Sequence, residues 1–436
     1  MAADSQMAKP STSKLRLTTF LLPIWRLSAL ALIVFLVHAH RTKLAIESGQ
    51  PVTAAEVRAY YPAARDLKLD EDKFGLDVLD ASGQELGYVL RTSPVCNRIT
   101  GYSGPTDTLI AFSPDWKVLG VRIRGSADTI THVADISNDP TFLKTWDGMA
   151  RKDVAVMDVQ KAGIEGVSGA TLTSMAVAYG IIARAKAERG QSVVPPQPMR
   201  FGMRDAGLLA VLATALLIAF TPARGRKWLR RLFQATVIGY VGFINGDLLA
   251  QSLMHGWTIS GTAWRMAPGA ALMLAAALLV PWTTRRPLYC QYLCPHGAAQ
   301  ELLDRISPKQ LRIHLHPALT RGLHWLPFLL LALALGVTML VLPLDLAGIE
   351  PFDAYLLRSA GWATLTIAGL GLLASLFVPM AYCKFGCPTG AVFEFLRSHG
   401  RNDSFGKRDV AAAFLVLWTG ALMWQHETIW RWIAGV

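Results

Sequence analysis

The feature that most constrains the fold is a series of apolar segments, each long enough to cross a lipid bilayer as a helix. A helix needs about 20 apolar residues to span the hydrocarbon core. The chain has 436 residues, 52% hydrophobic and only 17% charged, a composition too apolar for an ordinary soluble enzyme. We therefore predict a polytopic membrane protein with about six to seven spans, the last being the weakest. The expected spans are 18–39, 205–222, 232–253, 265–283, 323–344, 361–381 and 409–425.

The first span belongs to the first of three predicted parts of the chain. It lacks a small-residue cleavage site and runs directly into a polar region, which is typical of a retained anchor rather than a signal peptide. We predict a cytoplasmic tail and transmembrane anchor at 1–40, an extracytoplasmic soluble domain at 41–200, and an all-α polytopic membrane domain at 201–436.

The net charge of +12 indicates membrane topology rather than nucleic-acid binding. Basic residues concentrate at 224–231, 285–286 and 384–408, after the second, fourth and sixth spans, whereas the alternate connections at 254–264 and 345–360 carry almost none. Lys and Arg are enriched in cytoplasmic loops. The pattern predicts a bacterial inner-membrane protein with its soluble domain on the periplasmic side and no nucleic-acid partner.

The soluble domain is predicted to be α+β. Alternating apolar residues after turn signals favour strands at 108–112 and 118–124, with a looser strand-turn-strand pattern at 76–87. Helices are expected at 141–149 and 172–189. The fold class is therefore an α+β domain inserted after one transmembrane helix and followed by an all-α membrane domain.

Residues 165–174 read EGVSGATLTS and lead into the second of these helices. Ser168 or Thr171 could cap the helix, with Gly169 permitting a tight turn. A helix N-terminus also favours a phosphate group, because free N–H groups and the helix dipole point at it. Small residues would let that phosphate approach the backbone. The residues alone leave both interpretations open.

The segment SGATLTS resembles the flavinylation motif of FMN-binding domains in the sodium-pumping quinone reductase, in Rnf-type complexes and in NosR-type membrane flavoproteins. The resemblance implies FMN joined to Thr171 by a phosphodiester bond, installed by a flavin transferase outside the membrane. The upstream run GYSGPTDTLIAFSPDWKVLGVRI extends the resemblance, while Glu165 stands where the family usually has Asp. The cofactor-binding residues implied in this way are Ser168, Gly169, Ala170, Thr171, Thr173, Asp128 and Thr129.

Four of the five cysteines form an internal repeat. Residues 289–298 read YCQYLCPHGA and residues 382–391 read YCKFGCPTGA, and each copy follows a span that ends in Val-Pro. Both Cys-x3-Cys-Pro motifs, at 290–295 and 383–388, are predicted at the cytoplasmic face. In that reducing compartment paired thiols more often bind metal than form disulfides.

Four thiolates from two equivalent loops suit a tetrahedral all-cysteine site, which holds either an iron–sulfur cluster or zinc. Inert thiols packed at the membrane edge are the alternative, which a repeat in register disfavours. The loops resemble the iron–sulfur membrane domain of NosR-type and NapH-type proteins, which implies a 4Fe-4S cluster, with zinc less favoured. The chain resembles a short form of that family, without the further C-terminal ferredoxin domain. The expected metal ligands are Cys290, Cys294, Cys383 and Cys387.

Other polar residues carry weaker signals. Cys96 has no partner cysteine in the soluble domain and is expected to be an incidental thiol. Asp247 falls inside the third span, where a carboxylate serves either a proton or quinone role or a helix–helix hydrogen bond. The histidines near the outer face are expected to be polar anchors rather than haem ligands.

These features predict an electron-transfer component rather than a self-contained catalyst. Electrons would pass between a quinol or cytoplasmic donor and an extracytoplasmic redox partner, within membrane lipid. A sensor, regulatory or maturation protein of the NosR/NirI type without turnover is an alternative, and a zinc-stabilised scaffold is another. A centre at the inner face and a flavin outside would lie up to about 30 Å apart across the hydrocarbon. Either a quinone or another cofactor bridges that gap, or the flavin domain docks closely.

Overall fold

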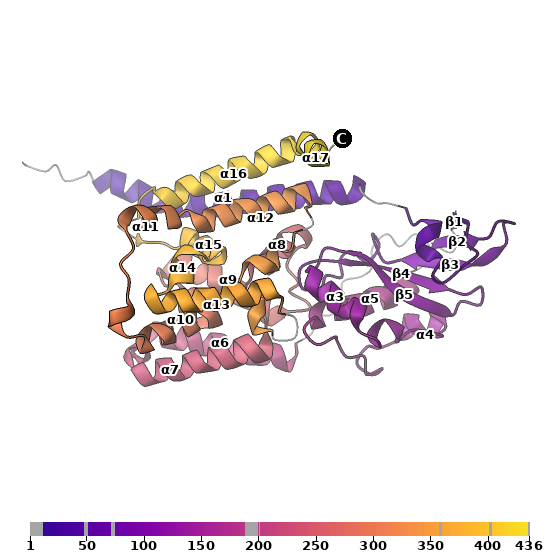
Figure 1. Ribbon diagram of the computed structural model, residues 1–436, viewed down its shortest axis with the longest axis horizontal. Coiled ribbons are helices and arrows are strands. Elements are labelled where there is room, and N and C mark those ends of the chain that lie inside the picture. The colour runs from indigo at the N-terminus through magenta and orange to yellow at the C-terminus, as the bar shows by residue number, and fades with distance from the viewer. Residues whose placement is uncertain are drawn as a thin grey trace, which may run out of the picture.

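The computed structural model describes residues 12–47, 51–70, 75–187, 199, 201–342, 344–356, 360–400 and 403–434. A β-sheet domain lies at one end of the long axis and a helical part at the other (Figure 1). Along the chain, one helix is followed by the α+β domain and then by the helical part, which confirms the predicted order.

The β-sheet domain, called the outer domain below because it is predicted to lie outside the membrane, is built on a five-stranded antiparallel meander in the order β1-β2-β3-β4-β5. Residues alternate between its two faces, as the pleat requires. Leu90 pairs with Ile110 on the face that carries the main helices, while Val89 pairs with Ala111 on the other face. The predicted strands are confirmed, and the looser 76–87 pattern resolves into β2 and β3. The strands are β1 (Asp66–Asp70), β2 (Gly75–Leu79), β3 (Glu85–Arg91), β4 (Thr106–Phe112) and β5 (Val118–Ser126).

Helices cover both faces of this sheet. α5 (Thr171–Lys186), α4 (Arg151–Val156) and α3 (Ile130–Asn138) lie over one face, and the short α2 (Ala54–Val57) over the other. The helix expected at 172–189 is confirmed within its described part.

The helix expected at 141–149 is wrong. The chain forms only a short 3-10 turn, η1 (Phe142–Lys144), followed by further turns. Asp139 accepts hydrogen bonds from the backbone N–H groups of Thr141 and Phe142 at 2.9 and 2.7 Å, and Gly148 has a left-handed φ of 75°. Local side-chain bonds and a left-handed glycine both compete with a continuing helix.

The helical part contains α1 (Thr12–Glu47), α6 (Met203–Phe220), α7 (Lys227–Thr236), α8 (Gln251–Ser260), α9 (Pro268–Thr284), α10 (Pro295–Ile306), α11 (Pro317–Leu323), α12 (Leu326–Leu340), α13 (Trp362–Phe377), α14 (Ala381–Phe385), α15 (Pro388–Leu396), α16 (Lys407–Trp424) and α17 (His426–Ala434). Among the described residues, three helical segments are long and apolar enough to cross a membrane: Leu21–Leu44, Met203–Phe220 and Pro317–Leu340. α9 and α13 are apolar but shorter. The predicted total of spans stays a prediction.

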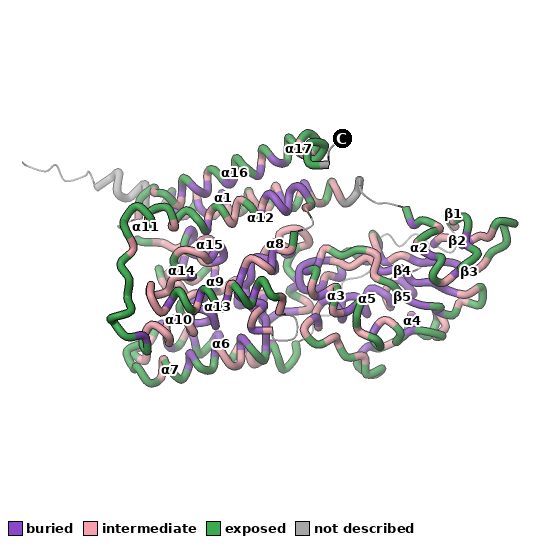
Figure 2. The backbone as a smooth tube through the Cα atoms, viewed as in Figure 1, coloured by how far each residue is buried: buried purple, intermediate pink, exposed green. Residues whose placement is uncertain are grey.

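Large apolar side chains point outward from these helices. Leu217, Leu329 and Leu417 are 64%, 61% and 72% exposed, and much of the outer surface of the helical part is exposed in Figure 2. Apolar residues on the outside of a helical bundle are what contact with lipid hydrocarbon requires.

The third predicted span, 232–253, is wrong as a single helix. α7 continues into a π-helix, η3 (Val237–Asn245), the chain then leaves helical geometry at 246–250, and α8 follows. Gly246 adopts a left-handed φ of 76°, and the Asn245 side chain both accepts from the backbone N–H of Asp247 at 3.0 Å and donates to the Arg204 carbonyl at 3.0 Å. Irregular backbone at membrane depth is tolerated where protein groups satisfy it in this way.

A buried ion pair joins α1 to the start of α16. The guanidinium of Arg26, 1% exposed, contacts Asp409 and Asp403 at 2.8 Å each. A charge this deep is stable only when it is paired and hydrogen-bonded. The N-terminal helix is therefore an integral part of the bundle.

The outer domain packs directly on α8. Ser103 Oγ donates to the Ser252 carbonyl at 3.2 Å, and Trp257 Nε1 donates to the Tyr102 carbonyl at 3.1 Å. Gly256 faces Ser103 so closely that a side chain would have no room. The outer domain is therefore docked closely on the helical part. Close docking was one of the two ways in which the predicted separation between flavin and metal centre could be overcome.

Candidate functional site

Thr171 begins α5 and its hydroxyl is not used as a helix cap. The N-cap is Ala170, with no side-chain cap hydrogen bond, so the alternative interpretation, in which Ser168 or Thr171 caps the helix, is wrong. Thr171 Oγ1 makes only a long bond, 3.4 Å, to the Val167 carbonyl. The loop before it is tight because Gly169 has φ 90°. A half-buried hydroxyl thus lies at the N-terminus of a 16-residue helix, where a phosphate is favoured.

The hydroxyl of Thr171 borders a cavity of about 320 Å³ between the outer domain and the helical part. Five residues implied by the flavinylation motif line it: Ser168, Gly169, Ala170, Thr171 and Thr173. Tyr102, His132 and Leu172 complete the outer-domain wall. The facing wall comes from the helical part and consists of Arg204, Phe243, Ile244, Asn245, Gly246, Asp247 and Leu356.

The residues of this second wall were missed as flavin-site residues by sequence reasoning. Arg204 donates to the Asn245 carbonyl and makes an ion pair with Asp247 at 3.4 Å. In the sequence, residues 245–247 attract notice only because they are polar residues within a predicted membrane span. The break in that span places them at the cavity. Arg204 supplies the positive charge that a flavin phosphate would find there.

Asp128 organises this region without lining the cavity. Its carboxylate accepts from the backbone N–H groups of Tyr102, Ser103 and Thr129 at 2.9, 3.1 and 2.8 Å, and from Thr173 Oγ1 at 2.7 Å. These bonds join the docking loop to the first turn of α5. Asp128 and Thr129 instead line a neighbouring cavity of about 270 Å³. The structure gives Asp128 a positioning role.

His132 lies beside the Asp128 carboxylate, 3.9 Å from it, and packs edge-on against Tyr102 with ring centroids 4.9 Å apart. Burial acts to lower the pKa of His132, but the carboxylates of Asp128, Asp353 and Asp135 together outweigh burial and the pKa is raised. At a given pH, His132 on the wall of the cavity is therefore protonated to a greater extent than a free imidazole.

The two cysteine motifs adopt the same local structure. The second cysteine of each, Cys294 or Cys387, is the N-cap of a helix that begins with proline, α10 or α15. Cys294 Sγ accepts from the backbone N–H of Gly297 at 3.4 Å, and Cys387 Sγ accepts from that of Gly390 at 3.1 Å. N–H groups at a helix start stabilise negative charge on sulfur.

Glycine at the third position after each of these cysteines has a steric reason as well. A Cβ on Gly297 would lie 2.9 Å from the Cys290 carbonyl oxygen, and one on Gly390 would lie 3.2 Å from Cys387 Sγ. The first cysteine of the second motif, Cys383, also accepts from Gln300 Nε2 of α10 at 3.1 Å, which ties the two motifs together.

All four cysteines line one cavity of about 720 Å³. Within the described residues, no group of three or more His, Cys, Asp or Glu side chains is close enough as it stands to hold a metal ion. Four thiols around so large a cavity fit a multi-atom iron–sulfur centre.

Two tyrosines connect this cavity with the flavin-side cavity. Tyr289, next to Cys290, accepts from the backbone N–H of Leu249 at 3.0 Å, and Tyr102 donates to the carbonyl of Leu248 at 3.5 Å. Tyr289 lines the cysteine cavity and Tyr102 lines the flavin-side cavity. One short piece of backbone therefore lies between the two walls.

Cys96 belongs to neither site. It is 4% exposed, its Sγ donates to the Gly180 carbonyl at 3.6 Å, and burial raises its pKa to about 12. The expectation of an incidental thiol agrees with this packing.

Two protein-family models match the chain at the two sites. The model described as an FMN-binding domain matches residues 101–183, which contain Thr171. The model described as a 4Fe-4S binding domain matches at 266–314 and 360–406, and each match contains one cysteine pair. The chain is therefore a protein that binds FMN and an iron–sulfur cluster.

Three curated relatives are similar to parts of the chain. The putative electron transport protein YccM of Escherichia coli (strain K12) is 26% identical over 43% of this chain and 56% of its own length. The regulatory protein NosR of Pseudomonas aeruginosa is 32% identical over 27% of this chain and 17% of its own. Protein NirI of Paracoccus denitrificans is 29% identical over 44% of this chain and 32% of its own.

The chain thus spans little more than half of the length of YccM and less of the length of NosR and NirI. No solved structure matches it significantly. Together with the family models, these relatives confirm the predicted resemblance of the chain to NosR-type membrane proteins with FMN-binding and iron–sulfur domains.

Proposed function

We propose that the chain is a membrane-bound electron carrier, with FMN attached covalently to Thr171 and an iron–sulfur centre held by Cys290, Cys294, Cys383 and Cys387. When bound, the two cofactors supply the redox chemistry, and the protein supplies position and electrostatics. Electrons pass between a quinol or cytoplasmic donor and an extracytoplasmic reductase system. The name of the relative YccM, a putative electron transport protein, supports this assignment.

The observation that carries the proposal is the short link between the two cavities. Tyr102 and Tyr289 both hydrogen-bond to the backbone at Leu248 and Leu249, one from each cavity wall. The flavin domain is docked on α8 by Ser103, Tyr102 and Trp257. Electron transfer between the two sites then needs no third cofactor to bridge a full bilayer.

The protein's own groups suit the charges that such cofactors bring. The N–H groups at the start of α5, together with Arg204, face the position of a phosphate ester on Thr171. The N–H groups of Gly297 and Gly390 hold the thiolates of Cys294 and Cys387.

Flavin fluorescence in a denaturing gel tests the covalent link. Wild type, Thr171→Ala and the control Thr145→Ala, which removes an exposed outer-domain hydroxyl, are each co-expressed with a flavin transferase. We expect a fluorescent band in wild type and control and none in Thr171→Ala. A dark wild-type band, or a fluorescent Thr171→Ala band, would contradict covalent attachment at this position.

A regulatory role without turnover is the second candidate, because two relatives are named regulatory protein NosR. Sustained quinol oxidation by the purified protein with an added acceptor separates the two. An electron carrier turns over repeatedly, whereas a sensor stops after its own cofactors are reduced.

A further inference from the structure

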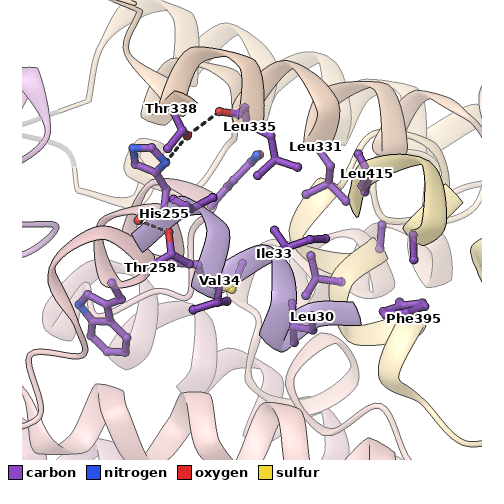
Figure 3. A pocket seen from close by; sticks show the side chains of 18 of the residues that line it. Leu30, Ile33, Val34, His255, Thr258, Leu331, Leu335, Thr338, Phe395 and Leu415 are labelled. Atoms are coloured by element: carbon purple, nitrogen blue, oxygen red, sulfur yellow. Dashed lines mark hydrogen bonds between the residues drawn. The ribbon is translucent and has the colours of Figure 1, made fainter. Parts of the chain in front are cut away.

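A third cavity, of about 280 Å³, lies within the helical part. Figure 3 shows Leu30 and Ile33 of α1, Leu331 and Leu335 of α12 and Leu415 of α16 arranged around it. Its wall is almost wholly apolar, and its volume is near the lower end of small-molecule sites, which begin at about 300 Å³. It therefore suits an apolar molecule with a compact ring.

One face of α8 gives the cavity a polar end. Gln251 and His255 are four residues apart, so they lie on the same side of the helix, and both line the cavity. Gln251 is 5% exposed, and its Oε1 has no hydrogen-bond partner among the residues that the structure describes. A buried acceptor without a partner is costly, so its presence indicates a ligand that donates to it.

The contacts of His255 fix how its ring is used. His255 Nδ1 lies 2.6 Å from Thr338 Oγ1, and that hydroxyl donates its only proton to the Ala334 carbonyl at 2.6 Å (Figure 3). The hydroxyl must therefore accept from Nδ1–H, which leaves Nε2 with a lone pair. With a neutral His255 ring, the polar end thus offers two acceptors, as a hydroxyl-bearing ring requires, while the cavity lining also includes the charged Arg408.

This cavity adjoins the cysteine cavity. The two share the lining residues Phe328, Ala391, Phe395 and Arg408. A second connection runs through Glu350, whose carboxylate accepts from the backbone N–H of Gln251 and from Thr389 Oγ1, two residues after Cys387. A molecule in this cavity would therefore lie in a space that adjoins the proposed iron–sulfur site.

We propose that this cavity binds the ring of a lipid-soluble quinone in its quinol form, with Gln251 Oε1 and His255 Nε2 accepting from the quinol hydroxyl groups and the leucine-lined wall around its tail. The inference rests on the proposed function in one respect: the neighbouring centre gives a quinol a reason to bind here. A phospholipid acyl chain would fill the wall equally well but would leave Gln251 unpaired.

Quinone binding to the detergent-purified holoprotein tests the site. Ubiquinone-2 and menaquinone-2, each reduced to its quinol, are titrated separately onto pre-reduced protein without oxygen, and bound quinone is quantified after gel filtration and reoxidation. Gln251→Leu and His255→Leu keep the apolar volume and remove one partner each. Thr258→Val is the matched control, because that hydroxyl lines the cavity but is already bonded to the His255 carbonyl at 2.6 Å. Leu335→Trp fills the cavity.

We expect saturable binding of at least one quinone by wild type and by Thr258→Val. Gln251→Leu and His255→Leu should each bind it about 5- to 10-fold more weakly, the effect of one neutral hydrogen bond, and Leu335→Trp should not bind it. Gln251→Leu should also raise the Tm of the quinone-free protein, because it removes the unpaired oxygen. A residue with a merely structural role would lower Tm instead.

Equal affinity in wild type, Gln251→Leu and His255→Leu, or displacement of either quinone by phospholipid at equal concentration, would overturn the site. Flavin and iron are measured in the same samples. Absent quinone binding in protein that carries both cofactors overturns this inference alone. Quinone binding that depends on Gln251 in protein without flavin or iron supports the inference and contradicts the proposed function.

Discussion

The cysteine cavity takes all four expected ligands from two copies of one motif, whereas the flavin-side cavity is assembled from segments far apart in the chain. Each cysteine loop forms its part of the site from local sequence: a cysteine at the N-cap, a proline at the first helical position and a glycine three residues after the cysteine. The flavin-side cavity instead joins residues 168–173 of the outer domain to Arg204 and 243–247 of the helical part.

This difference has a physical consequence. A site made of repeats is stable wherever the two copies face each other, so its integrity depends on the bundle alone. A site made between two domains depends on their docking, which here rests on Ser103, Trp257 and the Asp128 network. The two sites should therefore respond to different substitutions, and the following predictions separate them.

The largest effect is expected from Cys294→Ser. The serine hydroxyl is a poor substitute for thiolate in an iron–sulfur site, so the variant should lose essentially all of its iron and acid-labile sulfide while keeping flavin on the outer domain. Cys96→Ser, which changes a buried thiol of the outer domain, should keep both. Metal analysis and in-gel fluorescence on the same preparation give the answer; parallel loss of flavin in Cys294→Ser would refute independent sites.

Asp128→Asn should have the next largest effect, on the flavin side only. Its carboxylate accepts four hydrogen bonds from buried groups, and a bond to a charged group contributes about 1.5–3 kcal/mol, so we expect roughly 3 kcal/mol of destabilisation. Hydrogen–deuterium exchange should speed up in α5 of the full-length protein, with no change in iron content. Asp153→Asn, an exposed carboxylate of α4, is the control and should exchange like wild type.

The stability of the outer domain should fall as pH rises above about 6.5, through His132. The folded-state pKa of His132 is raised above its ordinary value of 6.5, because the carboxylates of Asp128, Asp353 and Asp135 together outweigh burial. A raised pKa gives stability that is fully present below 6.5 and is lost as pH rises through the folded pKa. Each pH unit that separates the folded pKa from the unfolded pKa corresponds to about 1.4 kcal/mol. His132→Gln should lack this loss between about pH 6 and pH 9; an unchanged pH profile would show that the histidine is not responsible.

Arg204→Gln should give the smallest effect. The Arg204 side chain is 47% exposed and already paired with Asp247, so its interaction with a flavin is screened. We expect covalent flavin to be retained and its two-electron potential to fall by about 10–20 mV, equivalent to less than 1 kcal/mol. Redox titration at the flavin absorbance measures this, with the exposed Arg224→Gln as control. A rise in potential would place the flavin ring elsewhere.

The sequence predicted those parts of the molecule whose signal is local. The strands at 108–112 and 118–124 show the alternation of apolar residues that any half-buried sheet imposes. The two cysteine motifs have nearly the same sequence, so their equivalence can be recognised without a structure. SGATLTS identified the outer wall of the flavin-side cavity, where Thr171 and Thr173 lie. Each of these features is contained within about ten consecutive residues of the chain.

Two of the features that sequence reasoning missed depend on contacts between distant segments, and a third depends on local turn signals. The apolar run 232–253 looks like one span, and only the pairing of Asn245 with Arg204 shows why the helix stops. Asp128 was expected to touch the cofactor, yet its bonds go to Tyr102, Ser103 and Thr173. The helix expected at 141–149 failed because Asp139 and Gly148 favour turns, a signal that was present in the sequence and was outweighed by apolar spacing.

The central claim, that electrons move between the cysteine site and the flavin within one chain, is tested most directly by following flavin absorbance after quinol is added to the purified protein without oxygen. Cys294→Ser and wild type are compared at equal covalent flavin content. The account predicts that the wild-type flavin bleaches and that the flavin of Cys294→Ser stays oxidised. Equal bleaching in both would show that electrons reach the flavin without the four-cysteine centre.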